Sequence, residues 1–329
     1  MIKYPIGIQT FSNIREEQYL YVDKTQYVYE LANTKKYVFL SRPRRFGKSL
    51  LTSTFHAYFS GRKELFHGLA AEHMEKEWKK YPVLHFSLST AKRGTVEDLD
   101  SVIAMQLKWA EQQYGIGNDS RDVTARLSSL VMRLYEKLHQ PVVILIDEYD
   151  APMLDSNAKP ELQEQIRSIM RDFFSPLKAN EGLLRFVFLT GITKFSQLSI
   201  FSELNNLDNI SLFDQYSAIC GISKTELTTQ MKPDIEAMGE ALNMTYEECL
   251  KELTQFYDGY HFSEKSEDIF NPFSLVKAMN AGKIAPYWFG SGTPSFLLKL
   301  LDKYHVNLST LESQETVCLF FCLQKEKPH

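Results

Sequence analysis

Short apolar runs recur along the first 190 residues of the chain, each bounded by polar or turn-forming residues. Runs of this length that are rich in β-branched and aromatic residues predict strands, and apolar runs without alternation are typical of parallel strands covered on both faces. The run at 142–146 contains only valine, isoleucine and leucine, so we expect it to be a central strand. The predicted strands are residues 37–40, 83–88, 142–146 and 183–190.

Segments with helical spacing separate these runs. Thr95 with Asp98 resembles a capping box, and Gly61 is placed to end the helix that follows the first strand. Strands that alternate with helices predict an α/β fold, here a five-stranded, mostly parallel sheet with helices on both faces. The predicted helices are residues 25–33, 50–59, 62–80, 95–114, 123–138 and 160–178, and short outer strands are expected at 19–25 and 218–222.

The composition of the chain changes after residue 222. Ser223 with Glu226 forms a capping-box pattern, and helical spacing continues well beyond it. We therefore predict two domains, residues 1–222 carrying the sheet and residues 223–329 forming a mainly helical lid and C-terminal region. The apolar run 317–323 lies six residues from the end of the chain, where it needs a surface to pack on. It either packs locally or indicates a missing domain, and we expect the C-terminal region to be truncated.

A candidate phosphate-binding loop, Arg42–Ser49, connects the first predicted strand to a predicted helix. It matches the motif G-x-x-x-x-G-K-[ST] except that Arg42 replaces the first glycine, and Pro43 favours an extended rather than a sharply turned start. Lys48 would reach the β and γ phosphates of ATP, and the Ser49 hydroxyl would ligate Mg²⁺. The alternative is a basic loop on a solvated surface. The residues expected to line the phosphates are Arg44, Arg45, Phe46, Gly47, Lys48, Ser49 and Leu50.

An acidic pair, Asp147 and Glu148, stands at the carboxyl end of the central predicted strand. Open α/β sheets bind their ligands at this end of their strands. This is the Walker B pattern, in which Asp147 would hold Mg²⁺ through water and Glu148 would activate the water that attacks the γ-phosphate. The competing interpretation is an acidic cap on a strand-to-loop connection, and the phosphate-loop motif upstream makes it the weaker one.

Two further pairs of residues are candidates for the same chemistry. Thr190 or Thr193, at the end of the fourth predicted strand, stands where a γ-phosphate sensor is found, although threonines there equally well satisfy loop backbone. Arg167 and Arg171 lie one turn apart on a predicted helix, so one of them could act as an arginine finger toward a neighbouring copy. Ordinary ion pairs on an exposed helix face are the simpler interpretation of these arginines.

Charge and composition exclude several classes of protein. A net charge of −4 gives no global attraction to nucleic acid or anionic lipid, so the basic cluster at 42–48 is not read as a DNA-binding patch. No apolar run approaches transmembrane length, and the N-terminus lacks the apolar core of a signal peptide. The cysteines are too few for a disulfide framework and lack zinc-site spacing, which predicts reduced thiols and a cytoplasmic protein. They are Cys220, Cys249, Cys318 and Cys322.

Taken together, these motifs resemble those of a known family, the predicted AAA-ATPase-like proteins. The resemblance covers residues 5 to about 301, and the family's loop also carries arginine in place of the first glycine. Family members typically continue into a PD-(D/E)xK nuclease-like domain, which this chain is expected to lack because it ends before such a domain could fit. Residues after about 310 no longer resemble the family, which indicates a truncated or frameshifted end. The stretches that carry the resemblance are Pro5–Gln9, Tyr21–Thr25, Phe39–Ser49, Ile146–Asp150, Thr190–Ser196 and Tyr257–Tyr260.

The resemblance implies a P-loop ATPase of the additional-strand class that hydrolyses ATP to ADP and phosphate with Mg²⁺. The apolar run at 83–88 falls between the loop and the acidic pair along the chain, as an additional strand would, and a helical lid is expected from residue 223. The implied site residues are the catalytic Glu148, Lys48 and Thr190 and the metal ligands Ser49 and Asp147.

A second interpretation is a nucleotide-gated switch protein that hydrolyses ATP slowly or not at all. Such a protein would regulate a partner or a nuclease in defence or mobile-element conflict. Glu148 favours hydrolysis, whereas the lack of a clear arginine supplied by a neighbour favours the switch. The sequence leaves open whether a second copy of the chain or another protein binds, and it shows no nucleic-acid partner.

Overall fold

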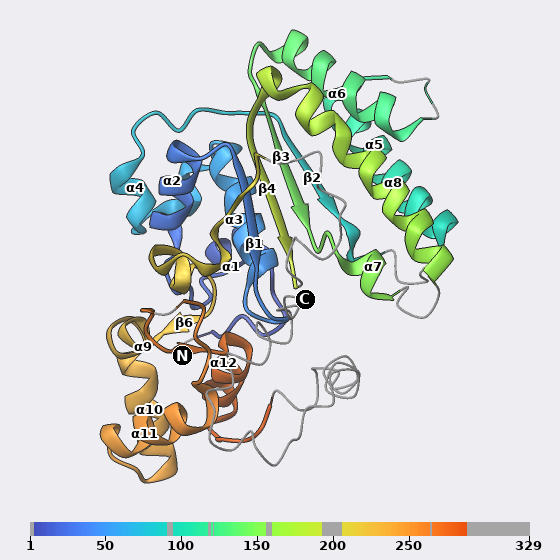
Figure 1. The fold of residues 1–329 in the computed structure, drawn as a ribbon. Helices are drawn as coiled ribbons and strands as arrows, with labels where there is room; N and C mark the ends of the chain where they lie inside the picture. Colours follow the sequence, from blue (N-terminus) through green and yellow to red (C-terminus); the bar gives the residue numbers. More distant parts are fainter. Residues whose placement is uncertain are drawn as a thin grey trace.

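A five-stranded parallel sheet forms the centre of the computed structural model (Figure 1). The strands are ordered β2-β3-β4-β1-β5 and neighbours run parallel throughout, so the predicted α/β fold is confirmed. The structure describes residues 3–90, 95–117, 120, 122–155, 160–192, 206–263 and 265–287. The strands are β1 (Tyr37–Ser41), β2 (Val83–Ser87), β3 (Val142–Asp147), β4 (Leu184–Gly191) and β5 (Asp208–Asn209).

One prediction about the sheet is wrong, namely that the run at 83–88 supplies the additional strand. That run forms β2, which lies at the edge of the sheet beside β3. The strand inserted between β1 and β3 is β4, which pairs with both of them. Order along the chain does not fix order in a sheet, because a crossover connection can pass over a neighbouring position.

The central strand β3 is buried at every position, as its composition predicts. Its side chains alternate between two apolar clusters on opposite faces of the sheet. Val143 and Leu145 join one cluster, and Ile144 and Ile146 join the other. A strand with apolar side chains on both faces needs a layer of helices on each side.

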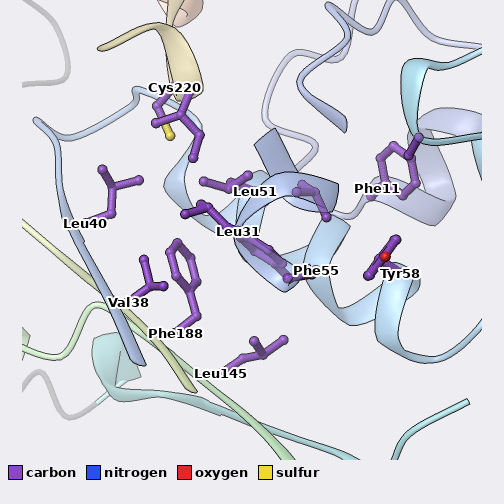
Figure 2. Packing of buried hydrophobic residues seen from close by; sticks show 14 of the residues in the cluster. Phe11, Leu31, Val38, Leu40, Leu51, Phe55, Tyr58, Leu145, Phe188 and Cys220 are labelled. Atoms are coloured by element: carbon purple, nitrogen blue, oxygen red, sulfur yellow. The ribbon is translucent and has the colours of Figure 1, made fainter. Parts of the chain in front are cut away.

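Helices supply both layers (Figure 1). On one face, Figure 2 shows Val38 and Leu40 of β1 and Phe188 of β4 near Leu51 and Phe55 of α3. This layer contains α1 (Phe11–Glu16), α2 (Thr25–Thr34), α3 (Lys48–Phe59) and α4 (Ala70–Met74), and the opposite layer contains α5 (Val96–Tyr114), α6 (Val123–Leu138) and α8 (Pro160–Ala179).

The helices α5 and α6 begin close to their predicted positions because their first turns carry caps. The Thr95 hydroxyl accepts a hydrogen bond from the Asp98 N–H at 3.2 Å. Asp122 likewise accepts one from the Ala125 N–H at 2.7 Å. Each cap satisfies a backbone donor that the first helical turn leaves without a partner.

Two predictions in the N-terminal half are wrong. Residues 62–80 form only η1 (Lys63–Phe66) and α4, because Gly68, at φ +75°, interrupts the helix and Glu75, in an extended conformation, ends α4. Residues 19–25 form no strand, and Tyr19 makes only an isolated bridge to Lys3. Other short elements are η2 (Leu88–Thr90), α7 (Ala151–Asp155) and η3 (Glu181–Leu183).

The last strand of the sheet is also not where the sequence predicts it. The fifth position belongs to β5, and residues 218–222 include the end of η6 (Asp214–Ile219), which follows η5 (Ile210–Leu212). The next residues form β6 (Ile222–Ser223), which pairs antiparallel with β7 (Ile269–Phe270) outside the main sheet. Strands of two residues carry too little periodicity to be predicted.

Four helices after residue 222 pack around an apolar core of their own. The predicted capping box is present, with Ser223 and Glu226 each accepting a backbone hydrogen bond from the other. Tyr4, Leu20 and Val22 of the N-terminal segment pack against this same core. The helices are α9 (Lys224–Gln230), α10 (Lys232–Leu242), α11 (Tyr246–Tyr257) and α12 (Pro272–Ala281).

Two features predicted from the sequence can be compared with the structure, namely the reduced thiols and the lack of a membrane-spanning segment. Cys220 and Cys249 are buried free thiols, whereas Cys318 and Cys322 lie outside the described residues, as does the apolar run 317–323. Within the described ranges, no helix combines the length and apolar character needed to cross a membrane.

Candidate functional site

The candidate site lies at the carboxyl end of the sheet, where β1, β3 and β4 finish side by side. Ser41 pairs with Gly191, and the next N–H along the chain, that of Arg42, donates to the Gly191 carbonyl at 3.1 Å. The ladder between β3 and β4 extends in the same way, because the Tyr149 N–H donates to the Thr190 carbonyl at 2.9 Å. The phosphate-loop motif and the acidic pair are therefore brought to one edge.

The backbone of the loop turns through two left-handed residues before α3 begins. Arg45 has φ +68° and Gly47, the residue that precedes the helix, has φ +90°. Glycine reaches this region without steric cost, whereas a Cβ there is strained. The first turn of α3 then presents its N–H groups toward the loop, as an anion site requires.

Lys48 is buried inside the loop that it is predicted to serve. Its Nζ donates to the carbonyls of Arg42 and Pro43, both at 3.0 Å. Burial lowers the pKa of Lys48, and the charges of Asp147 and Asp150 act in the opposite direction. The ammonium thus rests on carbonyls of its own loop while it faces the acidic residues of the neighbouring strand.

Arg42, which stands where the motif has its first glycine, is only 1% exposed. Its guanidinium donates to the carbonyls of Ser41 at 2.9 Å, Ser211 at 2.8 Å and Tyr216 at 2.9 Å. The ring of Phe262 lies against the same group, 4.1 Å from the guanidinium carbon to the ring centroid. Arg42 is therefore a buried residue of the loop's support, and its guanidinium is not directed toward solvent.

The next two arginines lie on the outside of the loop. Arg44 is exposed, and Arg45 is exposed but stacks on the ring of Phe273 in α12, with the guanidinium carbon 4.2 Å from the ring centroid. Lys277 lies one turn further along α12, and its Nζ is 5.6 Å from the centroid of the Phe273 ring. The helix α12 thus contacts the loop directly.

Phe46 is buried, and it anchors the loop from its inner side. Its ring packs against Tyr260 and Phe262 at centroid distances of 4.7 and 5.4 Å, and its carbonyl accepts the Gly221 N–H at 3.0 Å. Its side chain is therefore committed to packing, and only its backbone remains for a phosphate. Of the other predicted loop residues, Ser49 and Leu50 are half-buried in the first turn of α3.

The acidic pair is held by the neighbouring strand. The Thr190 hydroxyl donates to Oδ1 of Asp147, and the Glu148 N–H donates to the same oxygen at 3.1 Å. Asp147 is only 5% exposed, so these contacts fix a nearly buried carboxylate at the end of β3. Hydrogen bonds of this kind orient a carboxylate for a metal ion.

Glu148 differs from Asp147 in both backbone and environment. Its φ of +52° is left-handed, which costs a non-glycine residue free energy and is met mostly at functional or tightly constrained positions. Burial raises the pKa of Glu148, and the neighbouring Asp147 raises it further. A carboxylate with a raised pKa next to a metal ligand suits a residue that must accept a proton.

Thr190 lies at the end of β4 beside Asp147, the strand end where the sequence predicts a phosphate sensor. Its side chain is fully buried, and its hydroxyl is bonded to Asp147. This geometry suits a residue that orients the metal ligand, while its predicted role at the γ-phosphate stays a prediction. The alternative sensor, Thr193, lies outside the described residues.

Sequence reasoning gave no role to Asp150, which ties the end of β4 to the start of α7. It is 1% exposed, and its Oδ2 accepts the Ile192 N–H at 2.8 Å. Gly191 lies so close that a Cβ there would approach the Tyr149 ring to 2.3 Å. In the sequence, Tyr149 and Asp150 directly follow Glu148, and this position beside the acidic pair could have marked them as site residues.

A largely apolar cavity of about 110 Å³ opens beside the phosphate loop. Lys24 stands in its wall and donates to the Ala218 carbonyl at 2.6 Å and to the Glu226 carboxylate. Burial lowers the pKa of Lys24, and the charge of Glu226 opposes that shift. The other walls come from the N-terminal segment (Pro5, Leu20, Tyr21, Val22), the loop and α3 (Phe46, Gly47, Leu50, Leu51), residues 219–222 and α12 (Pro272, Val276).

The residues present fit a magnesium ion that is shared with a nucleotide. Asp147 offers one oriented carboxylate and Ser49 one hydroxyl, the donor types that Mg²⁺ accepts alongside phosphate oxygens and water. Among the described residues, no group of three or more histidine, cysteine or acidic side chains forms a metal site. A dedicated cage of protein ligands is therefore not part of this site as described.

The two arginines predicted as possible fingers are engaged on their own helix. Arg167 donates to Glu164, and Arg171 donates to the same carboxylate at 3.3 Å. These are exposed pairs within α8, which is the simpler of the two interpretations that the sequence allows.

Comparisons with known proteins relate the chain to a described family. A model of the family described as predicted AAA-ATPase matches residues 5–201. An uncharacterized protein from the vnfD 5′ region of Azotobacter chroococcum mcd 1 is 38% identical over 312 residues, which is 94% of this chain and 58% of that protein. The chain therefore spans little more than half the length of this relative.

Two solved structures are similar to most of the chain at low TM-scores. The Aeropyrum pernix ORC2 protein in ADPNP–ADP complexes is 14% identical with a TM-score of 0.33, covering 90% of this chain and 77% of that one. Drosophila ORC bound to poly(dA/dT) DNA and Cdc6 is 11% identical with a TM-score of 0.30, covering 97% of this chain and 49% of that one.

Proposed function

The chain belongs to the predicted AAA-ATPase family, and from that premise we propose that it binds ATP with Mg²⁺ at the loop Arg42–Ser49 and hydrolyses it to ADP and phosphate. The observation that carries this proposal is the meeting of three features at one sheet edge. They are a left-handed Gly47 before a helix N-terminus, the buried Lys48, and the oriented pair Asp147 and Glu148.

The loop would receive the phosphates. Lys48 already faces the acidic residues of β3, and a bound triphosphate would replace the carbonyls of Arg42 and Pro43 as its partners. The backbone N–H groups from Arg44 to Leu50 would donate further hydrogen bonds to the phosphates, beside the charge of the Lys48 ammonium. Positioning and charge neutralisation of this kind supply most of the rate in phosphoryl transfer.

The base of the nucleotide would enter the cavity beside Gly47 and Leu50. Apolar walls suit the faces of a purine, and the wall residue Lys24 supplies a polar edge. The cavity is lined both by the segment before α2 and by α12, so a bound nucleotide would touch the sheet region and the helices after residue 222 together.

Asp147 and Ser49 would hold Mg²⁺, which when bound neutralises charge on the β and γ phosphates. Glu148 would orient the attacking water and accept its proton, a task that its raised pKa suits. Thr190 would keep the Asp147 carboxylate turned toward the loop.

The test is nucleotide titration of the full chain by calorimetry, with and without Mg²⁺, together with a phosphate-release assay at saturating ATP. We expect ATP to bind more tightly with Mg²⁺ than without it, and phosphate to appear at a rate proportional to protein concentration. A folded chain that binds no ATP under either condition would remove the assignment of the loop.

One observation favours the rival function, a nucleotide-gated switch with little hydrolysis. Arg167 and Arg171 are both paired with Glu164 of their own helix, an engagement that a role in a second copy's site would have to break. Tight ATP binding without phosphate release would select the switch. We further propose that a helical lid begins near residue 222 and that the protein is cytoplasmic. Its partner would be a second copy of the chain or another protein.

A further inference from the structure

The phosphate loop lacks the glycine that usually starts it, and the side chain that replaces this glycine points into the protein. The Arg42 guanidinium is bonded to four backbone carbonyls, of which three belong to Ser211, Tyr216 and Ser217, far along the chain. These acceptors are neutral. Burial lowers the pKa of Arg42 to about 10, so the group still carries its charge at neutral pH.

Phe262 contacts the loop at two points, its first residue Arg42 and its middle residue Phe46. Its ring lies 4.1 Å from the Arg42 guanidinium carbon and 5.4 Å from the Phe46 ring, measured to its centroid. Phe262 is only 2% exposed, and an aromatic ring attracts a cation most strongly where water is excluded. A single ring therefore links the start of the loop to Phe46, within the segment whose backbone is expected to hold the phosphates.

The backbone held in this way is also the resting place of Lys48. The carbonyls of Arg42 and Pro43 accept hydrogen bonds from the Lys48 ammonium at 3.0 Å. Fixing the start of the loop therefore fixes the position from which Lys48 would move onto a phosphate. The side chain of Arg42 can act on the nucleotide only through this backbone and through Lys48.

We propose that Arg42 and Phe262 are a pair of positioning residues that hold the phosphate loop in its binding shape, a task that the first glycine performs elsewhere by conformational freedom. The two residues are far apart in the sequence, because Arg42 follows β1 whereas Phe262 belongs to the segment between α11 and β7. The contribution of the pair to ATP affinity rests on the proposed function, whereas its effect on the loop does not.

A double-mutant cycle on the full chain tests the pair, using Arg42→Met, Phe262→Leu and the double variant. Phe66→Leu is the matched control, because Phe66 is buried in the same apolar cluster but packs on Phe11, Tyr58 and Trp78. The readouts are amide hydrogen exchange of residues 43–50 without nucleotide, ATP affinity by calorimetry, and the melting temperature.

We expect Phe262→Leu to speed exchange of the loop amides about tenfold and to weaken ATP binding about tenfold, a size typical of coupled neighbouring side chains. Phe66→Leu should lower the melting temperature about as much as Phe262→Leu does, but it should change neither the exchange of the loop amides nor the ATP affinity. The losses from Arg42→Met and Phe262→Leu should not add, because each removes the same contact.

Two results would overturn the proposal. One is wild-type loop exchange in Phe262→Leu, and the other is full additivity of the two losses. If Arg42→Met does not fold, the comparison of Phe262→Leu with Phe66→Leu still decides the question. Faster loop exchange in a protein whose wild type binds no ATP would support the positioning pair and reject the proposed function.

Discussion

The two halves of the candidate site are supported in different ways. Asp147 and Thr190 stand on adjacent strands whose ladder continues to the site, so the sheet itself fixes their separation. The phosphate loop is instead held by side chains, with Arg42 bonded to carbonyls 169 and 174 positions away. The strand half should therefore keep its geometry when a side chain is changed, whereas the loop half should depend on its distant partners.

The largest expected effect is chemical and belongs to the strand half. Glu148→Gln should leave ATP and Mg²⁺ affinity near wild type and reduce turnover about a hundred- to ten-thousandfold, because the amide cannot accept a proton from water. Single-turnover phosphate release and calorimetry measure the two properties. Asp147→Asn should differ from it by weakening Mg²⁺-dependent binding as well.

Glu136→Gln, on the exposed side of α6, is the control for this variant. Wild-type turnover in Glu148→Gln would mean that another residue is the base or that the measured activity comes from a contaminant. No turnover in the wild type would leave Glu148 without a demonstrated role and favour the switch.

The next effect belongs to the loop half. Lys48→Ala should weaken ATP binding about ten- to a hundredfold, because a charge-assisted contact to phosphate contributes about 1.5–3 kcal/mol. Calorimetry against the exposed-lysine control Lys63→Ala measures it. Equal affinity in the two variants would show that the ammonium never leaves the carbonyls of its loop.

A third prediction measures how tightly the strand half is packed. Gly191→Ala should lower the free energy of unfolding by about 3 kcal/mol, since its Cβ would lie 2.3 Å from the ring of Tyr149, which is fully buried. Urea unfolding gives the value. A loss below about 1 kcal/mol would mean that β4 can shift and that the strand half is less rigid than its ladder implies.

The smallest effect is the matching substitution in the loop. Gly47→Ala meets no atom within 4 Å, so its cost is only that of holding a Cβ at φ +90°, about 1–2 kcal/mol. ATP affinity should fall along with stability if the left-handed turn is needed to present the N–H groups. Unchanged affinity would show that the cradle tolerates another backbone conformation.

The same contrast explains which parts of the site could be predicted from the sequence. Asp147 and Glu148 follow an apolar run, and the helix α5 begins at a cap, so local patterns contain enough information for both. The order of strands, the two-residue β5 and the contacts of Arg42 depend on which distant segments meet. Thr190 was placed at the right strand end, but its hydrogen bond to Asp147 could not be read from spacing.

The position of Phe262 bears on how such proteins can be divided and recombined. The match to the family model ends at residue 201, whereas β5, the carbonyl of Ser211 and the ring of Phe262 all lie beyond it. A segment cut at that boundary would leave a buried guanidinium without most of its acceptors. Exchange of C-terminal portions between relatives is therefore constrained, because a transplanted portion must bring a ring and carbonyls that suit the recipient's loop. The stretch that the family model matches is shorter than the unit that could be inherited intact.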